Sequence, residues 1–291
     1  MPQMLNDYLR ERFGKKLYKI SINAGMTCPN RDGTLGTGGC IFCSGSGSGE
    51  FAGKPQMGIT EQIEAGKARI STKLPKGDFG YIAYFQAFTN TYAPVEKLRE
   101  LYMEAADHPE VEVISIATRP DCLGQDVLDL LSEINDIKPV WIELGLQTIH
   151  EGTAQYIRRG YLLSTYDEAV RNLRERGLET IVHVLLGLPG ETKDDMLSTV
   201  GYVGKSGVQG IKLQLLHVLK GTDLADDFLA GKFKCLTEDE YIDIVRSSLA
   251  LLPDDMVIHR MTGDGDKRIL IAPLWSGNKK RVINRLRMEI S

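Results

Sequence analysis

Short apolar runs alternate with helical patterns along most of the chain, beginning at Leu17. Six such runs predict strands, at residues 17–22, 79–85, 111–117, 140–146, 180–186 and 211–218. The segments between them carry apolar residues at the i, i+3, i+4, i+7 spacing of a core-facing helix, as in Val127, Leu130, Leu131 and Ile134. Six repeats of strand and helix predict an α/β fold in one main domain.

Two threonine-led segments are expected to open helices. Thr165–Glu168 and Thr237–Glu240 each place a threonine three residues before a glutamate. In a capping box of this kind, each side chain accepts a hydrogen bond from the other residue's backbone N–H. We therefore predict one helix start at each threonine.

Several predicted strands carry polar side chains at alternate positions. Glu143 and Gln147 share one face of the fourth run, His183 lies in the fifth, and Lys212 lies in the sixth. Strands buried on both faces are expected to be apolar throughout, so this alternation predicts a polar interior face. A closed eight-stranded barrel fills its interior with branched apolar side chains. The pattern favours a wider or open barrel that encloses a ligand, with a doubly wound sheet as the alternative.

Composition narrows the class of protein. The 291 residues are 42% hydrophobic and 25% charged, which excludes a fibrous or wholly disordered chain. No uncharged apolar run approaches the roughly 18 residues of a membrane helix. The first ten residues carry mixed charge where a secretory signal has an apolar stretch, so we expect a cytoplasmic protein that does not contact a membrane.

Charge is unevenly distributed. The net charge of −4 argues against a broadly basic nucleic-acid binder. Residues 278–291 nevertheless hold five basic groups and one acid. This tail is either the solvated face of a terminal helix or a contact to a phosphate backbone.

The strongest local signal is a cysteine-rich loop after the first predicted strand. Cys40 and Cys43 form a Cys-x2-Cys pair, and Cys28 can return to them across a glycine-rich segment. Zinc would need a fourth ligand, and no other cysteine or histidine shows ligand spacing. Three cysteines instead suit a [4Fe–4S] cluster with one iron open to a further ligand. Zinc and a redox dithiol remain as alternatives.

This loop resembles that of the radical S-adenosylmethionine (SAM) superfamily. Phe42 precedes the last cysteine, where those enzymes place an aromatic residue beside the adenine. Eleven residues separate Cys28 from Cys40 instead of the common three, and this gap resembles the Elongator-like branch. The resemblance extends over about residues 17–275 and continues in five motifs, at Thr118–Asp121, Glu143–Thr148, Arg158–Tyr161, Leu186–Thr192 and Gly221–Leu224.

The resemblance implies a fold. It is the partial (β/α)6 TIM-type barrel of the radical SAM enzymes, expected over residues 17–235 and matching the six predicted strands. Residues 1–16 would form an N-terminal extension. Residues 236–291 would form a short C-terminal helical extension that ends in the basic tail.

The resemblance also implies two cofactors, a [4Fe–4S] cluster and SAM. Cys28, Cys40 and Cys43 would hold the cluster, whose fourth iron would bind the amino and carboxylate groups of SAM. The residues expected to bind SAM are Phe42, Gln86, Glu143, Gln147, Arg159 and His183. Gln86 stands where many members have a Gly-Gly-Glu motif, which this chain lacks.

Three of these residues also have simpler explanations. Glu143 could be a structural hydrogen-bonding group of the interior, and His183 a satisfied core histidine. Arg158 and Arg159 could be a charged pair at a helix end. Cys122 and Cys235 are expected to be small buried hydrophobic residues.

The activity implied by the resemblance is reductive cleavage of SAM to a 5′-deoxyadenosyl radical that modifies a tRNA wobble uridine. The chain resembles the short bacterial MnmL/YtqA group, associated with converting carboxymethylaminomethyl-uridine to aminomethyl-uridine. Its length leaves no room for the acetyltransferase domain of larger members. Arg119 could then bind the substrate carboxylate, because a planar guanidinium binds carboxylates in a bidentate manner.

The expected partners are tRNA, through its anticodon stem-loop, and an electron donor such as flavodoxin or ferredoxin. The oligomeric state is left open. One alternative is a radical SAM oxidoreductase of a small metabolite such as a tetrapyrrole, which the acidic balance of charge favours. Another is a zinc- or cluster-binding module without catalytic activity.

Overall fold

The computed structural model describes residues 2–71, 77–263 and 265–290, and a parallel sheet forms its centre. The sheet has eight strands in the order β1-β9-β7-β6-β5-β4-β3-β2. Its strands are β1 (Gln3–Met4), β2 (Lys16–Ile22), β3 (Phe79–Phe85), β4 (Val111–Thr118), β5 (Val140–Gln147), β6 (Glu179–Leu186), β7 (Gly210–Leu215) and β9 (Val257–Arg260). An antiparallel pair, β8 (Val218–Leu219) and β10 (Leu270–Ala272), lies outside this sheet.

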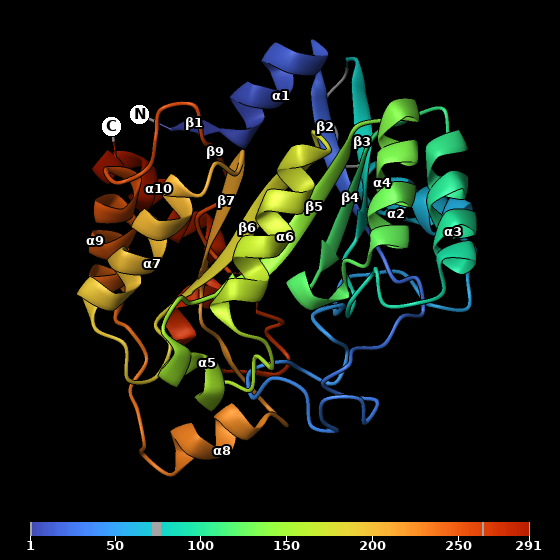
Figure 1. Ribbon diagram of the computed structural model, residues 1–291. Helices are drawn as coiled ribbons and strands as arrows, with labels where there is room; N and C mark the ends of the chain where they lie inside the picture. Colours follow the sequence, from blue (N-terminus) through green and yellow to red (C-terminus); the bar gives the residue numbers. More distant parts are fainter. Residues whose placement is uncertain (1, 72–76, 264, 291) are drawn as a thin grey trace.

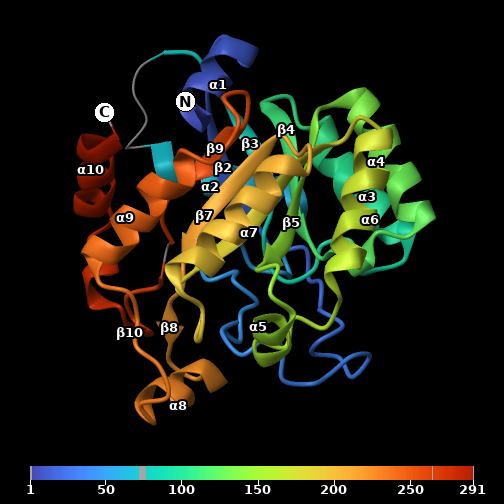
Figure 2. The same ribbon diagram turned by 60° about the vertical axis from the view of Figure 1, so that its left-hand side comes forward.

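Most of the helices cover the outer face of the sheet (Figures 1 and 2). The α-helices are α1 (Leu5–Phe13), α2 (Ile59–Ile70), α3 (Val95–Asp107), α4 (Gln125–Ile137), α5 (Glu151–Tyr156), α6 (Leu163–Glu175), α7 (Lys193–Lys205), α8 (Asp223–Leu229), α9 (Glu238–Leu249) and α10 (Lys279–Ile290). Two short 3₁₀ helices follow β4 and β10, at Pro120–Cys122 and Leu274–Gly277. Within the described ranges, none of the helices has the length and apolar character that a membrane crossing requires.

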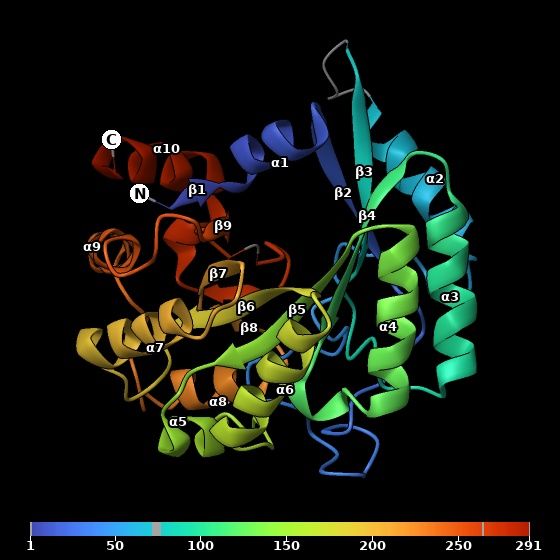
Figure 3. The same cartoon turned by 45° about the horizontal axis from the view of Figure 1, so that its top comes forward.

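The sheet is curled into an open half-barrel (Figure 3). Strands β2 to β7 lie side by side in chain order. A doubly wound sheet would instead reverse its strand order at a central strand. The structure thus confirms the predicted partial (β/α)6 barrel and excludes the doubly wound alternative, and β9 and β1 extend the sheet beyond β7.

The two faces of each strand carry different side chains. On β5, Ile142 and Leu144 point outward into the main hydrophobic core, which also includes residues of α3, α4 and α6. Glu143 and Gln147 point inward and line a cavity. The polar interior that the alternation predicts is confirmed.

Helix α1 covers the amino-terminal end of the half-barrel interior. Its Leu9 is buried in a separate apolar cluster, with Leu5, Tyr8 and Phe13 packed against it. The remaining members of this cluster come from the strands: Leu17, Ile82, Val113, Trp141 and Ile181. The interior is therefore closed by apolar packing at this end and open toward the loops at the other.

One of the two predicted helix starts is wrong. The helix expected at Thr165 is α6, which begins at Leu163 without a side-chain cap from its own N-cap residue. Its first N–H donates instead to Glu151 Oε1 at 2.7 Å, so a carboxylate from α5 takes the place of a local cap. The capping box from Thr237 to Glu240 is confirmed at the start of α9.

The last predicted strand and the C-terminal extension also differ from expectation. The run 211–218 is broken, because β7 ends at Leu215 and Val218 belongs to β8. The extension expected to be helical contains α9 and α10, but it also supplies β9, which pairs with β7 and β1. Residues from both ends of the chain therefore complete one edge of the sheet.

Candidate active site

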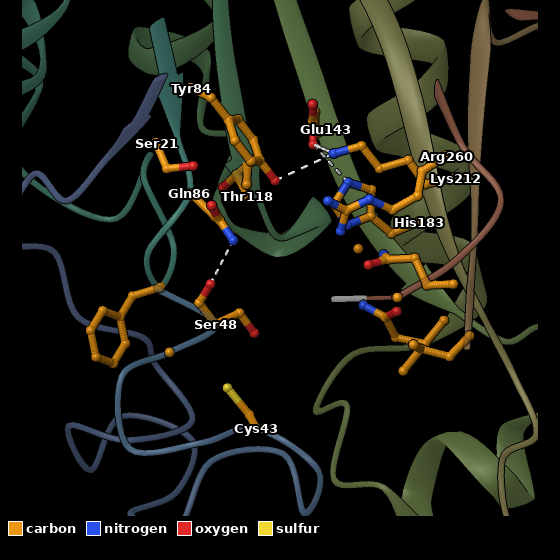
Figure 4. A pocket seen from close by; sticks show the side chains of 18 of the residues that line it. Ser21, Cys43, Ser48, Tyr84, Gln86, Thr118, Glu143, His183, Lys212 and Arg260 are labelled. Atoms are coloured by element: carbon orange, nitrogen blue, oxygen red, sulfur yellow. Dashed lines mark hydrogen bonds and ion pairs between the residues drawn. The ribbon is translucent and has the colours of Figure 1, made fainter. Parts of the chain in front are cut away.

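A cavity of about 560 Å³ lies inside the half-barrel and connects its two ends (Figure 4). Cys28, Cys40 and Cys43 line it at the carboxyl ends of the strands. Lys19 and Glu143 line it near the apolar cluster under α1. All ten residues predicted for the site contribute to this lining: Cys28, Cys40, Phe42, Cys43, Gln86, Arg119, Glu143, Gln147, Arg159 and His183.

The cysteine loop is held by two side chains from within it. Asn30 Nδ2 lies 3.5 Å from Cys40 Sγ and donates to the carbonyl oxygen of Arg158 at 2.7 Å. Arg31 donates to the carbonyl oxygen of Cys43 at 2.9 Å. These contacts tie both members of the Cys-x2-Cys pair to the surrounding backbone.

The three thiols are not gathered as closely as the ligands of a single ion. Three sulfurs bound to one tetrahedral zinc would lie about 3.8 Å apart. Among the described residues, these cysteines do not form a group with all sulfurs within 4.8 Å of one another. Burial raises the pKa of Cys40 to about 12, with a further contribution from Cys43, so a free thiol there stays protonated at neutral pH. Metal coordination would remove that proton.

A turn after α5 packs beneath the cysteine loop. Arg159 is 2% exposed, and its guanidinium donates to the carbonyl oxygens of Thr148 and Tyr161 at 2.6 and 3.0 Å. Gly160 has a φ of +83°, and a Cβ there would lie 2.6 Å from Asn30 Oδ1. Only glycine suits this position, both for its backbone conformation and for its space.

Arg119 has acceptors within the protein. Its Nε and Nη2 atoms donate to the two carboxylate oxygens of Asp121 at 2.9 and 2.7 Å, and its Nη1 donates to the carbonyl oxygen of Arg159. A substrate carboxylate would have to share this guanidinium with Asp121. The expected substrate contact of Arg119 stays a prediction.

Backbone strain gathers around the cysteine end. Four described non-glycine residues have positive φ angles: Ser48, Phe88, Gln147 and Arg158. The first three line the cavity, and Arg158 accepts the hydrogen bond from Asn30. Gln86 donates to the carbonyl oxygen of Ser48 at 2.7 Å, which links β3 to the cysteine loop. Such conformations concentrate at functional sites, where the surrounding contacts stabilise them.

A buried ion-pair network crosses the closed end of the cavity. Glu143 is 0% exposed, and its Oε1 accepts hydrogen bonds from Lys19 Nζ at 2.8 Å and Ser115 Oγ at 2.7 Å. Its Oε2 contacts Lys212 Nζ and lies 2.9 Å from His183 Nε2. We name these five residues, from five different strands, the polar layer.

Electrostatics fixes the charge states in the polar layer. Burial alone would raise the pKa of Glu143, but Lys19, Lys212 and the bond from His183 hold it well below its usual range. Burial lowers the pKa of His183 to about 4, and Lys212 lowers it further in the same direction. At neutral pH, Glu143 is therefore ionised, and a neutral His183 donates its proton to it. The expected SAM contacts of both residues stay predictions.

Sequence reasoning missed three residues of the site. Lys19 occupies an inward position of β2, and only its charge within an apolar run could have revealed it. Asn30 and Arg31 lie between two cysteines without any motif that marks them. Their role depends on backbone carbonyls that come close only in the folded chain.

A second group of ligand-type side chains lies outside the cavity. Glu64, His108 and Glu110 bring their donor atoms within 4.8 Å of one another. Lys67 Nζ contacts both carboxylates, 2.7 Å from Glu64 Oε1, so an ammonium group already supplies the positive charge there. These contacts do not support a metal site at this group.

The basic tail forms α10 and packs on α9. Arg281 contacts Glu238, and Arg285 contacts both Glu238 and Asp239. Part of its positive charge is therefore matched within the protein. This pairing supports the interpretation of the tail as a helix face, and a phosphate contact stays a prediction.

Comparison with known families matches the geometry. Residues 27–203 match the radical SAM superfamily, and residues 208–291 match the Radical SAM C-terminal domain. The chain belongs to the radical SAM superfamily. It is a radical SAM enzyme, and its cofactors are those of the superfamily, a [4Fe–4S] cluster and SAM.

Individual relatives cover most of this radical SAM chain. It is 46% identical to the uncharacterized protein YtqA of Bacillus subtilis (strain 168), over 98% of this chain and 88% of that protein. It is 22% identical to the tRNA uridine(34) acetyltransferase of Methanocaldococcus jannaschii, over 95% of this chain and 57% of that protein.

Solved structures confirm the fold. The archaeal Elp3 of Methanocaldococcus infernus superposes with a TM-score of 0.68 at 16% identity, covering 94% of this chain and 63% of that one. The coproporphyrinogen III oxidase HemN of Escherichia coli gives 0.54 at 17% identity, covering 82% and 53%. Both share the radical SAM half-barrel.

Proposed function

We propose that this enzyme modifies the C5 substituent of the tRNA wobble uridine, converting carboxymethylaminomethyl-uridine to aminomethyl-uridine. The observation that carries the proposal is one cavity with three cysteines at its open end and a charged polar layer at its closed end. A relative over nearly the whole chain is named for tRNA uridine(34). Such a cavity has room for a cofactor and for a reacting group of the substrate.

In this proposal, Cys28, Cys40 and Cys43 hold the cluster. Together with SAM, the bound cluster supplies a carbon-centred radical that abstracts hydrogen from the substrate. This donor set is supported by two observations: all three thiols line the cavity, and among the described residues they are not gathered as closely as the ligands of a single ion. Asn30 and Arg31 position the thiols through backbone carbonyls and the Cys40 sulfur.

Of the expected SAM residues, Glu143 and His183 belong to the polar layer, and the others line the cavity outside that layer. Phe42 packs against a small apolar cluster beside the loop and presents one side to the cavity. Gln147 also lines the cavity, and a Cβ on Gly145 would lie 2.8 Å from its Nε2. Arg159 acts indirectly in this proposal: its hydrogen bonds hold the turn that packs beneath the cysteine loop. The apolar cluster under α1 borders the far end of the cavity.

A wobble uridine suits a cavity of this kind. Bases in a single-stranded anticodon loop can leave the stack without breaking a duplex. The C5 substituent would enter first and approach the polar layer. The base would then remain beside the cysteine loop. Its C5 substituent would lie between the cofactors and the charged side chains of the polar layer.

A small-metabolite oxidoreductase is the second candidate. The net charge of −4 and the pairing of α10 arginines with α9 acids both favour a partner that is not a polyanion. A tetrapyrrole carries carboxylates that the lysines of the polar layer could also bind. Retention of the protein on bulk tRNA would separate the two candidates.

The deciding experiment compares modified nucleosides in tRNA from cells with and without the protein. We expect carboxymethylaminomethyl-uridine to accumulate and aminomethyl-uridine to fall when the protein is absent. A strain that carries Cys40→Ser in place of the parent protein should behave like the deletion. Unchanged nucleosides in both strains would reject the tRNA reaction.

A further inference from the structure

Two lysines flank one aromatic ring at the closed end of the cavity. The Nζ atoms of Lys19 and Lys212 lie 4.7 and 4.6 Å from the ring centroid of Tyr84. Both also contact Glu143, one at each carboxylate oxygen. Figure 4 shows Lys212, Glu143 and Tyr84 converging on this end of the cavity.

The sheet register holds the basic residues in one row. His183 pairs in register with Lys212 on the neighbouring strand, and Lys212 pairs with Arg260 on the next. Register partners on parallel strands project to the same face. All three side chains line the cavity, so the position of the row follows from backbone pairing.

Basic side chains outnumber acidic ones among the described groups of this layer. Lys19 and Lys212 bring two basic side chains against the single carboxylate of Glu143. Burial holds the pKa of Lys212 well below its usual range. Tyr84, His183 and His259 also face the layer, and burial keeps each of them neutral at pH 7. A nearby negative charge favours the protonated form of a buried lysine, so an anionic ligand would stabilise this arrangement.

The two ammonium groups also keep hydrogen-bond donors for a ligand. Each has three N–H bonds. Lys19 donates to Glu143, and Lys212 donates to Glu143 and, at 3.4 Å, to the hydroxyl of Tyr84. Within the described part of the chain, the two protonated lysines therefore keep three of six donors for a ligand, and both side chains line the cavity. By contrast, the guanidinium of Arg119 already holds Asp121 in a bidentate pair.

We propose that Lys19 and Lys212 form a carboxylate-binding site at the closed end of the cavity. As a specificity site for the substituent of the modified uridine, this inference rests on the proposed function. Glu143 is its positioning residue, because it contacts both lysines and holds them beside the ring of Tyr84. The site selects a substrate that carries a carboxylate over the same substrate with a neutral amide.

A fragment of the substituent tests binding without any turnover. Sarcosine reproduces its carboxymethylamino group, and sarcosinamide differs only by the neutral amide. We expect saturation-transfer NMR on the reconstituted enzyme, with SAM and without reductant, to show sarcosine binding about 10- to 100-fold more tightly than the amide. Inorganic phosphate at equal concentration should not displace sarcosine, and displacement would overturn the choice of a carboxylate.

Variants assign that preference to the lysines. Lys19→Met should remove the preference for sarcosine, and Lys212→Met should do the same if it folds. Lys16→Met is the matched control, because Lys16 begins the same strand and lies outside the cavity lining. Equal preference in the Lys19→Met variant and in the parent would overturn the site.

Turnover separates this inference from the proposed function. An anticodon stem-loop with carboxymethylaminomethyl-uridine is supplied with the parent enzyme and with Lys19→Met, and the aminomethyl product is measured. If both enzymes form the product with equal efficiency, the proposed tRNA reaction stands and the carboxylate-binding site is rejected. If the parent forms no product but shows the lysine-dependent preference for sarcosine, the function fails and the site stands.

Discussion

The two ends of the cavity are built in different ways. At the open end, side chains such as Asn30 and Arg31 donate to backbone carbonyls, and strained residues such as Gln147 surround the loop. At the closed end, Glu143 and Lys212 meet side chain to side chain from neighbouring parts of one sheet. One end is thus a shaped loop, and the other is a charged network on a rigid scaffold.

Because of this difference, we expect changes at the two ends to affect different properties, cofactor binding at one end and stability at the other. A loop can be reshaped by one side chain without loss of the sheet, so changes at the open end should abolish cofactor binding in a folded protein. Glu143, Ser115 and Lys212 of the polar layer are buried, so changes at the closed end should act first on the free energy of unfolding. Each prediction below tests one side of that contrast.

The largest expected effect is at the open end. Cys40→Ser should lose the cluster, whereas the parent reconstituted without oxygen should hold about four irons per chain. Cys235→Ser is the control, because Cys235 packs against an apolar cluster and lies outside the cavity lining. Iron and sulfide analysis measures both. Cluster loss in the Cys235 variant alone would reverse the ligand assignment.

The next effect is at the closed end. Glu143→Gln leaves two lysines without their buried counter-ion and should lower the free energy of unfolding by about 3–5 kcal/mol. Glu112→Gln breaks a partly exposed pair with Lys15 and should cost at most about 1 kcal/mol. Urea denaturation compares the two variants. Equal losses would show that the polar layer is not a stabilising network.

A smaller effect concerns pH. Because burial lowers the pKa of His183 to about 4, the unfolded chain takes up a proton there before the folded chain does. The free energy of unfolding should therefore fall as the pH drops from about 6.5 to about 4, by about 2–3 kcal/mol for this group. His183→Gln should flatten that slope in urea titrations, with His259 supplying what remains. A parent-like slope in the variant contradicts the assignment.

The smallest expected effect is on tRNA binding by the basic residues of α10, which lie outside both ends of the cavity. Replacing Lys279, Lys280 and Arg281 with Gln should weaken tRNA binding and reduce its salt dependence. The slope should change by about 0.9 for each duplex phosphate that the variant no longer neutralises, or by about 0.7 for each phosphate of a single strand. SAM cleavage without tRNA should remain intact. Parent-like tRNA affinity and salt slope would leave α10 as a helix face paired with α9.

Local pattern was sufficient for the strand–helix repeat, the polar interior and the choice of the cysteine loop, whereas the partial barrel was implied by the family resemblance. Alternation on β5 correctly placed Glu143 and Gln147 inside, because a strand turns successive side chains to opposite faces. The same reasoning failed at α6, where Glu151 from another helix replaces the expected cap. It also missed β9, a four-residue strand whose place depends on pairing with β7 and β1.

The sequence by itself determined the order of strands and helices, the inward positions and the three cysteines, because periodicity and spacing are local properties of the chain. Only the tertiary structure decided that Glu143 pairs with both Lys19 and Lys212. The same holds for the ion pair between Asp121 and Arg119. Lys19 and Glu143 are 124 positions apart in the chain. Their contact depends on the curl and register of the whole sheet, which no local pattern encodes.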